Sequence, residues 1–282
     1  MPDSSHPADQ HKPRLDKGTV LGSLCAIAGI VGGLLLEQGS IADVSQATAA
    51  IIVFGGTMGA VLVGTPFKQV VAAARASRWV LFEPPHNLSG IFEQLIAYAT
   101  KARRLGILSL EEDAESIPDP FLKRAIDLAV DGLTSAELRE MLELDIQAEE
   151  ARTSQIAKVY EMAGGYAPTI GIIGAVLGLI QVMKNLANIE EVGHGIAVAF
   201  VATIYGVGAA NLLFLPAAAK IRNHAIRRTE LLELVAEGVA GITEGMNPRM
   251  LRRKLEPLTR AEGVFKAATS VESETASNTV SS

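Results

Sequence analysis

The sequence predicts an all-α, polytopic membrane protein with four transmembrane helices and a helical cytoplasmic domain. Of its 282 residues, 49% are hydrophobic, only 5% are aromatic, and the mean hydropathy is +0.28. Four separate runs reach the length of about 20 apolar residues that a helix needs to cross a bilayer. Soluble globular proteins rarely combine so many aliphatic residues with 26 glycines, so a membrane protein is the first interpretation.

The four candidate spans cover residues 18–36, 48–67, 164–183 and 195–219, and none contains Asp, Glu, Lys or Arg. They divide the chain into six expected segments. These are a disordered cytoplasmic N-terminus (1–16), spans one and two (17–67), a cytoplasmic helical domain (68–163), spans three and four (164–219), a cytoplasmic helix and tail (220–261), and a disordered end (262–282).

The distribution of basic residues predicts the orientation. The short connections 37–47 and 184–194 are poor in Lys and Arg, whereas the middle segment and the segment after span four hold most of the chain's 25 basic residues. Basic segments stay in the cytoplasm. Both long segments and both termini are therefore expected there.

The segments outside the membrane are expected to be helical, with no convincing strand. Apolar residues recur at three- and four-residue spacing before span three and after span four, so these helices should continue out of the spans. Ser135 is the expected N-cap of the first. Shorter helices should occupy 87–132, broken at Gly106 and at Pro118–Pro120.

Small residues recur at four-residue spacing in every span. Because lipid supplies little hydrophobic drive between helices, association depends on close packing that small residues permit. The spacing fits packing within one chain, and it also fits assembly around another protein's helix. The glycines of spans three and four that we assign to helix packing are Gly171, Gly174, Gly178 and Gly206.

The polar groups in the spans include hydroxyl, amide and phenol groups but no carboxylate. A proton-conducting protein normally carries an intramembrane carboxylate or histidine, so a partner would have to supply one here. The hydroxyl of Thr203 can instead satisfy a carbonyl of its own helix. Pro168 and Pro216 each remove a backbone donor and can bend their helices.

Four stretches together resemble the MotA/PomA family of flagellar motor stator proteins, over roughly residues 17 to 260. The resemblance lies in VLGSLCAIAGIVGGLLLEQGSI in span one, GYAPTIGIIGAVLGLI in span three, VATIYGVGAANLLFLPAA in span four, and GMNPRMLRRKLEPL at 245–258.

The resemblance implies a homopentamer in the bacterial inner membrane, around two copies of a MotB-like protein. That partner's single span carries an aspartate that binds the ion. Pro168 and Pro216 match the prolines that couple ion flow to movement, and Thr203 matches a threonine near the aspartate. Sodium-driven relatives have a second threonine where this chain has Ala175, so we expect proton coupling.

The resemblance also implies contact with the rotor protein FliG. In ARRLGILSLEED, Arg103 and Glu111 match the family's basic and acidic torque residues, and Arg104 and Glu112 are neighbours that could substitute. Without the resemblance, this run would be a solvated helix end.

The nearest alternative is an ExbB- or TolQ-like energy-transducing subunit, which has three spans and an external N-terminus. A transporter or membrane enzyme acting alone would usually carry an intramembrane charge, and a passive scaffold would explain only the packing motifs. The net charge of -6 argues against nucleic-acid binding. No catalytic, cofactor-binding or metal-ligand pattern is recognisable, so we do not expect an enzyme.

Overall fold

The structure is a computed structural model that describes residues 14–83 and 87–259, and within them the chain is almost entirely helical. The all-α prediction is confirmed. The sequence predicted no strand, but β1 (Arg14–Leu15) pairs antiparallel with β2 (Phe82–Glu83). Each strand has two residues, which is too short for a recognisable sequence pattern. The predicted disordered ends, 1–16 and 262–282, lie almost wholly outside the described residues.

The chain forms two compact units. The membrane unit comprises Met1–Pro85 and Arg152–His224, and the charged unit comprises His86–Ala151 and Ala225–Ser282. Four helices of the described chain are long and apolar enough to cross a membrane, as predicted.

Spans one and two are α1 (Lys17–Leu36) and the series α2 (Ala47–Ala50), η2 (Ile51–Gly55) and α3 (Gly56–Gly64). A 3-10 turn, η1 (Ile41–Val44), connects them. Span two ends at Gly64, three residues earlier than predicted. Thr65 has φ -140° and ψ 136°, because a residue before a proline is pushed out of the helical region.

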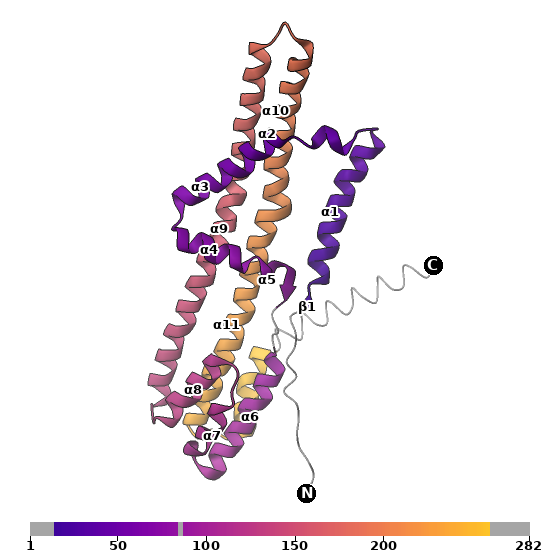
Figure 1. Cartoon of the computed structure of the whole chain (residues 1–282). Helices are drawn as coiled ribbons and strands as arrows, with labels where there is room; N and C mark the ends of the chain where they lie inside the picture. Colours follow the sequence, from indigo (N-terminus) through magenta and orange to yellow (C-terminus); the bar gives the residue numbers. More distant parts are fainter. Residues whose placement is uncertain (1–13, 84–86, 260–282) are drawn as a thin grey trace, which may run out of the picture. The chain divides into compact units, whose positions relative to one another are not determined.

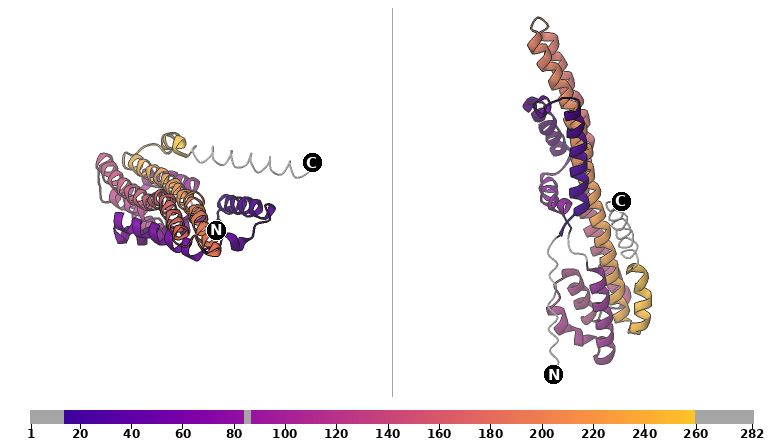
Figure 2. Two further views of the ribbon diagram at one scale, coloured as in Figure 1. Left: turned by 90° about the horizontal axis from the view of Figure 1, so that it is seen from above. Right: turned by 90° about the vertical axis from the view of Figure 1, so that its right-hand side faces the viewer.

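Spans three and four belong to much longer helices. The first is α9 (Ser135–Lys184), and the second runs through α10 (Ile189–Ala209), η4 (Ala210–Phe214) and α11 (Leu215–Thr243). The expectation that helices continue out of these spans is confirmed. Figures 1 and 2 show α9 and α10 side by side within the membrane unit.

Two predicted helix ends are wrong. Thr134, rather than Ser135, caps α9: its hydroxyl accepts from Glu137 N at 3.3 Å, and Glu137 Oε2 accepts from Thr134 N at 3.0 Å. This is a capping box. The predicted connection 184–194 shrinks to four residues, because Asn188 caps α10 by accepting from Glu190 N.

Two short helices follow span two in the membrane unit, α4 (Phe67–Ala76) and α5 (Arg78–Leu81). They pack against α9 and the start of α11 in one core. Its buried members are Val61, Ala73, Ala76, Ile156, Ala157, Val159, Ala163 and Ile221.

The charged unit gathers α6 (Leu88–Leu105), η3 (Ile107–Leu110), α7 (Glu111–Glu115) and α8 (Pro120–Val130) around the ends of α9 and α11 (Figure 1). A further helix covers residues 248–259. The predicted breaks are confirmed: Gly106 has φ +87°, and Asp119 caps α8 ahead of Pro120. The core of the charged unit is built largely from aliphatic side chains. Its largest members include Leu95, Leu110, Leu122, Ile126, Leu138, Leu142, Leu234, Leu251 and Leu255.

Candidate functional site

The α9–α10 contact is a seam of glycines. A Cβ added at Gly206 would lie 2.6 Å from the carbonyl oxygen of Ala167, and one at Gly171 would lie 2.9 Å from that of Ala202. Both distances are shorter than real Cβ contacts, and the obstructing atoms are backbone. Only glycine permits this approach.

The seam continues along both helices. A Cβ at Gly178 would lie 2.7 Å from the carbonyl oxygen of Gly195, and one at Gly174 would lie 2.8 Å from the Cβ of Ala202 and 3.3 Å from Ile52. All four predicted packing glycines therefore face helices of their own chain.

A second set of glycines has open space where a side chain would stand. A Cβ at any of them would meet no atom within 4 Å, and no residue of α1 is buried. Their spacing alone could not separate them from the seam glycines. This set includes Gly22, Gly29, Gly32, Gly33, Gly55, Gly59, Gly165 and Gly208.

Thr203 lies at the edge of the seam and is exposed. Its Oγ1 donates to the carbonyl oxygen of Ala199 at 3.2 Å, and its Cα is 3.5 Å from the Cβ position of Gly171. Ala175 is half-buried. Around them the spans expose apolar side chains, including Ile172, Val176, Phe200, Ile204 and Val207.

The structure brings the surroundings of Pro168 and Pro216 together. Pro168 lies inside α9 and has no N–H for the carbonyl of Gly164 one turn earlier. A Cβ at Gly164 would lie 2.7 Å from Leu215, the residue before Pro216. The chain is thus closely packed between the two proline sites.

Two π turns were not predicted. One, η4, ends where the N–H of Leu215 donates to Ala210 O, directly before Pro216. Pro216 has no N–H and so cannot donate a hydrogen bond to the preceding turn of its helix. The wider π turn lies directly before this missing hydrogen bond. The other, η2 in span two, packs against α10 through Val53, Val201 and Ala202. Pro216 was a signal for the first, but no proline marks the second.

Arg103 and Glu111 are both exposed at one end of the charged unit. Arg103 lies in the last turn of α6 and Glu111 begins α7, while Lys101 Nζ and Asp113 Oδ2 join the two helices at 2.7 Å. Between them Leu105 and Leu108 are 70% and 67% exposed. The prediction noted the charges but missed this apolar tip.

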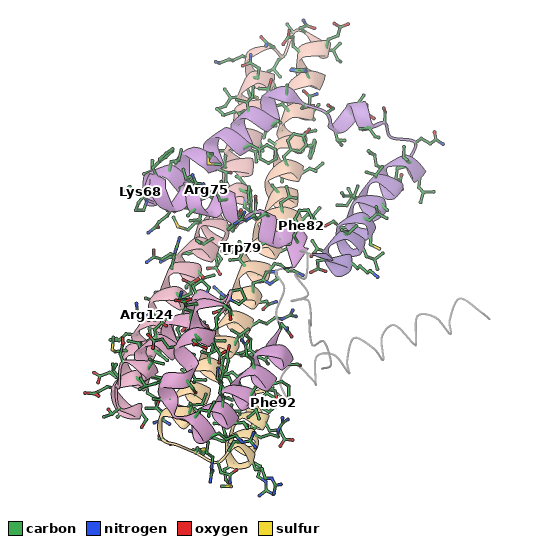
Figure 3. All side chains as sticks on the ribbon, turned by 60° about the horizontal axis from the view of Figure 1, so that its bottom comes forward. Lys68, Arg75, Trp79, Phe82, Phe92 and Arg124 are labelled. Atoms are coloured by element: carbon green, nitrogen blue, oxygen red, sulfur yellow. The ribbon has the colours of Figure 1, made fainter. Side chains whose placement is uncertain are left out.

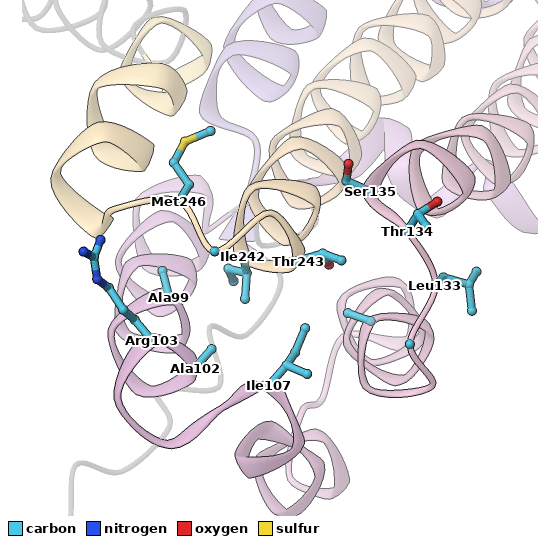
Figure 4. A pocket seen from close by; sticks show the side chains of 13 residues that line it. Ala99, Ala102, Arg103, Ile107, Leu133, Thr134, Ser135, Ile242, Thr243 and Met246 are labelled. Atoms are coloured by element: carbon cyan, nitrogen blue, oxygen red, sulfur yellow. The ribbon is translucent and has the colours of Figure 1, made fainter.

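An open cavity of about 570 Å³ adjoins Arg103 (Figure 4). It is lined by the ends of α6, α8, α9 and α11. Ala99, Ile107, Thr134, Ser135 and Thr243 are among the side chains that line it. No group of three His, Cys, Asp or Glu in residues 14–83 and 87–259 is placed to hold a metal ion.

Ion pairs fix the helix ends of the charged unit. Arg139 of α9 binds Glu237 of α11 at 3.1 Å and Glu244, the residue after that helix ends, at 2.9 Å. Burial pushes the pKa of Glu237 upward, but hydrogen bonds and charge from Lys254 and Arg139 outweigh it and lower that pKa. Burial also opposes ionisation of Asp119, yet Arg228 and the N–H groups of Leu122 and Phe121 leave its pKa below the ordinary value.

The comparisons with known proteins agree along the chain. Residues 113–234 match the MotA/TolQ/ExbB proton channel family, and residues 20–104 match the family described as Motility protein A N-terminal. Motility protein A of Bacillus subtilis is 34% identical over 245 residues, covering 86% of this chain and 90% of that protein.

Two solved structures share the fold. The structure of C. jejuni MotAB matches with a TM-score of 0.82 and 33% identity, over 86% of this chain and 96% of that one. The flagellar MotAB stator complex from Bacillus subtilis matches with a TM-score of 0.80 and 32% identity, over 90% and 100%. The N-terminal match favours a motility protein over an ExbB- or TolQ-like subunit. This chain belongs to the MotA/TolQ/ExbB proton channel family, among its motility protein A members.

Proposed function

We propose that this chain is a flagellar motor stator subunit that forms an ion channel with a MotB-like partner and converts ion flow into torque on the rotor protein FliG. Two observations together carry the proposal. The four spans contain no Asp, Glu, Lys or Arg, and Thr203 is exposed among apolar side chains of the spans. A channel built from such spans needs its carboxylate from elsewhere. The two structures described above are of MotAB, which supports that source.

Five copies of the chain would surround two copies of the partner in the bacterial inner membrane, with both termini cytoplasmic. The two sets of glycines support assembly. The seam glycines are used within the chain, whereas Gly29, Gly33, Gly55 and Gly59 leave close-approach surfaces open. Helices of neighbouring copies or of the partner can occupy those surfaces, and so can lipid molecules.

Protons are the proposed ion. Thr203 supplies one hydroxyl at the edge of the seam, and Ala175 supplies none. A desolvated sodium ion prefers several oxygen ligands, and this chain offers few beside the expected partner aspartate. A proton needs only the carboxylate.

Movement would be coupled through Pro168 and Pro216. Each removes a helical hydrogen bond, and the contact of Gly164 with Leu215 links the two sites. Because α9 and the α10–α11 series are long helices, a bend at either proline would displace residues far along the chain.

Rotor contact would be made by Arg103 and Glu111. Both are exposed, and neither forms an ion pair with the described residues, so their charges are available to a partner. Leu105 and Leu108 would add apolar contact between them. The electrostatic part would weaken with salt.

The experiment that tests the function is complementation of swimming in a strain lacking this chain. Pro168→Leu and Thr203→Val should leave the complex in the membrane but abolish torque. Gly193→Ala, at an exposed glycine outside the predicted spans where an added Cβ meets no atom within 4 Å, is the matched control and should swim. Loss of either variant from the membrane would make its residue structural and contradict its assigned role.

Separate arms test the ion and the rotor contact. Swimming should survive sodium removal and stop with a proton uncoupler; the opposite pattern would refute proton coupling. Reversing the charge of Arg103 in a chain that also lacks the Arg104 charge should impair swimming. Unchanged swimming would exclude Arg103 as a torque residue.

A further inference from the structure

The chain between Val44 and Glu83 carries positive charge without any acidic residue. It contains Lys68, Arg75 and Arg78 and no Asp or Glu, although the whole protein has a net charge of -6. The surplus is local, and it begins directly after span two.

Backbone geometry places these cations beside the end of the span. The span-two helix stops at Gly64, and Thr65 and Pro66 are both extended, with ψ values of 136° and 135°. A new helix, α4, begins at Phe67. Only two residues therefore separate the membrane-crossing helix from the basic one.

One face of α4 and α5 is held by the rest of the membrane unit. Ala73 and Ala76 are buried, the hydroxyl of Tyr160 donates to Ala73 O at 2.8 Å, and Gln69 donates to Gln155 at 3.1 Å. The carbonyl oxygen of Trp79 lies 2.9 Å from Nε2 of His224. These contacts fix which face points outward.

The outward face is basic and partly apolar. Lys68 and Arg75, both labelled in Figure 3, are seven residues apart on α4, so they share a side of the helix. Arg78 begins α5. All three are exposed, and so is Phe67, at 71%.

No described acidic group neutralises these cations. None of the three makes an ion pair or hydrogen bond with the described residues. Two acids of the same unit are already engaged: Asp16 pairs with Lys220, and Glu161 pairs with Arg222. The face therefore presents uncompensated positive charge.

We propose that the outward face of α4 and α5 binds the anionic headgroups of membrane phospholipids, through Lys68, Arg75 and Arg78, with Phe67 inserted among the acyl chains. A helix with basic and aromatic side chains beside a span suits the boundary between headgroups and hydrocarbon. An acidic protein segment would match the charge but not the exposed Phe67 next to a span end. The proposal requires span two to cross the bilayer and does not depend on torque generation.

The test uses Trp79, the only tryptophan of the chain, as a reporter. The complex of this chain with its partner is reconstituted into phosphatidylcholine vesicles that contain either brominated phosphatidylglycerol or brominated phosphatidylcholine. A Trp79→Phe complex gives the background from the partner. Bromine quenches tryptophan at short range, so the ratio of quenching measures the preference of nearby sites for the anionic lipid.

Wild type should be quenched more strongly by brominated phosphatidylglycerol. The variant K68Q/R75Q/R78Q should lose this preference, and R75Q alone should lower relative affinity about fivefold, since each basic residue near a bilayer contributes about that factor. The control K123Q/R249Q/R253Q removes three basic residues of the charged unit and should keep the preference.

Equal quenching of the wild type by the two lipids would overturn the proposal. So would an unchanged preference for the anionic lipid in both K68Q/R75Q/R78Q and R75Q. Absence of quenching by either lipid would also overturn it, because the face would then lie away from the bilayer. R75Q keeps the test usable if the triple variant does not assemble. Each of these outcomes leaves swimming and partner binding, and hence the proposed function, to be judged separately.

Discussion

The two units of the chain differ in how their helices pack within each unit. In the membrane unit α9 and α10 meet through glycine, with backbone atoms so close that a single added carbon would collide. In the charged unit most of the large buried core side chains are leucine and isoleucine, and ion pairs such as Arg139–Glu237 join the helices around that core.

The difference follows from the surroundings of each unit. In water, burying aliphatic surface stabilises a fold by about 25 cal/mol per Å², so large side chains give the largest gain. In lipid that gain disappears, and close contact between helices is what remains. The same chain therefore packs helices through glycine where it crosses the membrane and through large aliphatic side chains in the charged unit.

The largest expected effect breaks the aliphatic core. Leu95 is 0% exposed and packs against Gly238, so Leu95→Ala should lower the free energy of unfolding of the charged unit by about 2–5 kcal/mol. Leu144→Ala, at a site that is 61% exposed, is the matched control. Hydrogen exchange of α6 in the purified complex would show faster opening for Leu95→Ala alone, and equal exchange in both variants would contradict the assignment.

The next effect breaks the glycine seam. Gly206→Val should destabilise the membrane unit by about 1–3 kcal/mol or more, because the new side chain collides with the carbonyl oxygen of Ala167. The control is Gly193→Val, at an exposed glycine outside the predicted spans where an added Cβ meets no atom within 4 Å. Thermal melting of the complex in mild detergent should separate the two variants, and a similar melting temperature would mean that the seam yields at little cost.

The smallest effect concerns an ion pair of the charged unit. The pKa of Asp119 is lowered in the folded chain, so its contribution is complete above the unfolded pKa and is lost as pH falls through the folded pKa. Asp119 and Arg228 are 21% and 37% exposed, so screening limits the contribution to about 0.5–1 kcal/mol.

Asn still caps a helix, so Asp119→Asn removes mainly the charge. It should lower stability at neutral pH and reduce the difference between neutral and acidic pH. Asp127→Asn, exposed on the same helix, controls for net charge. A wild-type chain whose stability does not fall more steeply than that of Asp119→Asn in acid would contradict the lowered pKa.

The same contrast explains what could be predicted from the sequence. Long uncharged runs and apolar stripes depend on neighbouring residues, so the spans and the helices that continue out of them were predicted correctly. The faces of the glycines depend on which helix lies opposite. Gly174 and Gly59 have equivalent GxxxG spacing, yet only Gly174 contacts another helix of the chain.

The π turn in span two and the apolar tip of the charged unit could not be predicted from the sequence, because both depend on how distant parts of the chain pack. The π turn at Ile51–Gly55 lies where span two packs against α10, and nothing in its five residues marks it. Leu105 and Leu108 look like core residues by type, and only the fold shows that they face outward.

The measurement that tests the central claim most directly is the subunit mass and composition of the complex purified from membranes in mild detergent. A stator subunit should be recovered as five copies of this chain with two copies of a single-span protein that carries an intramembrane aspartate. Recovery of a lone chain, or of a homodimer without such a partner, would contradict the account.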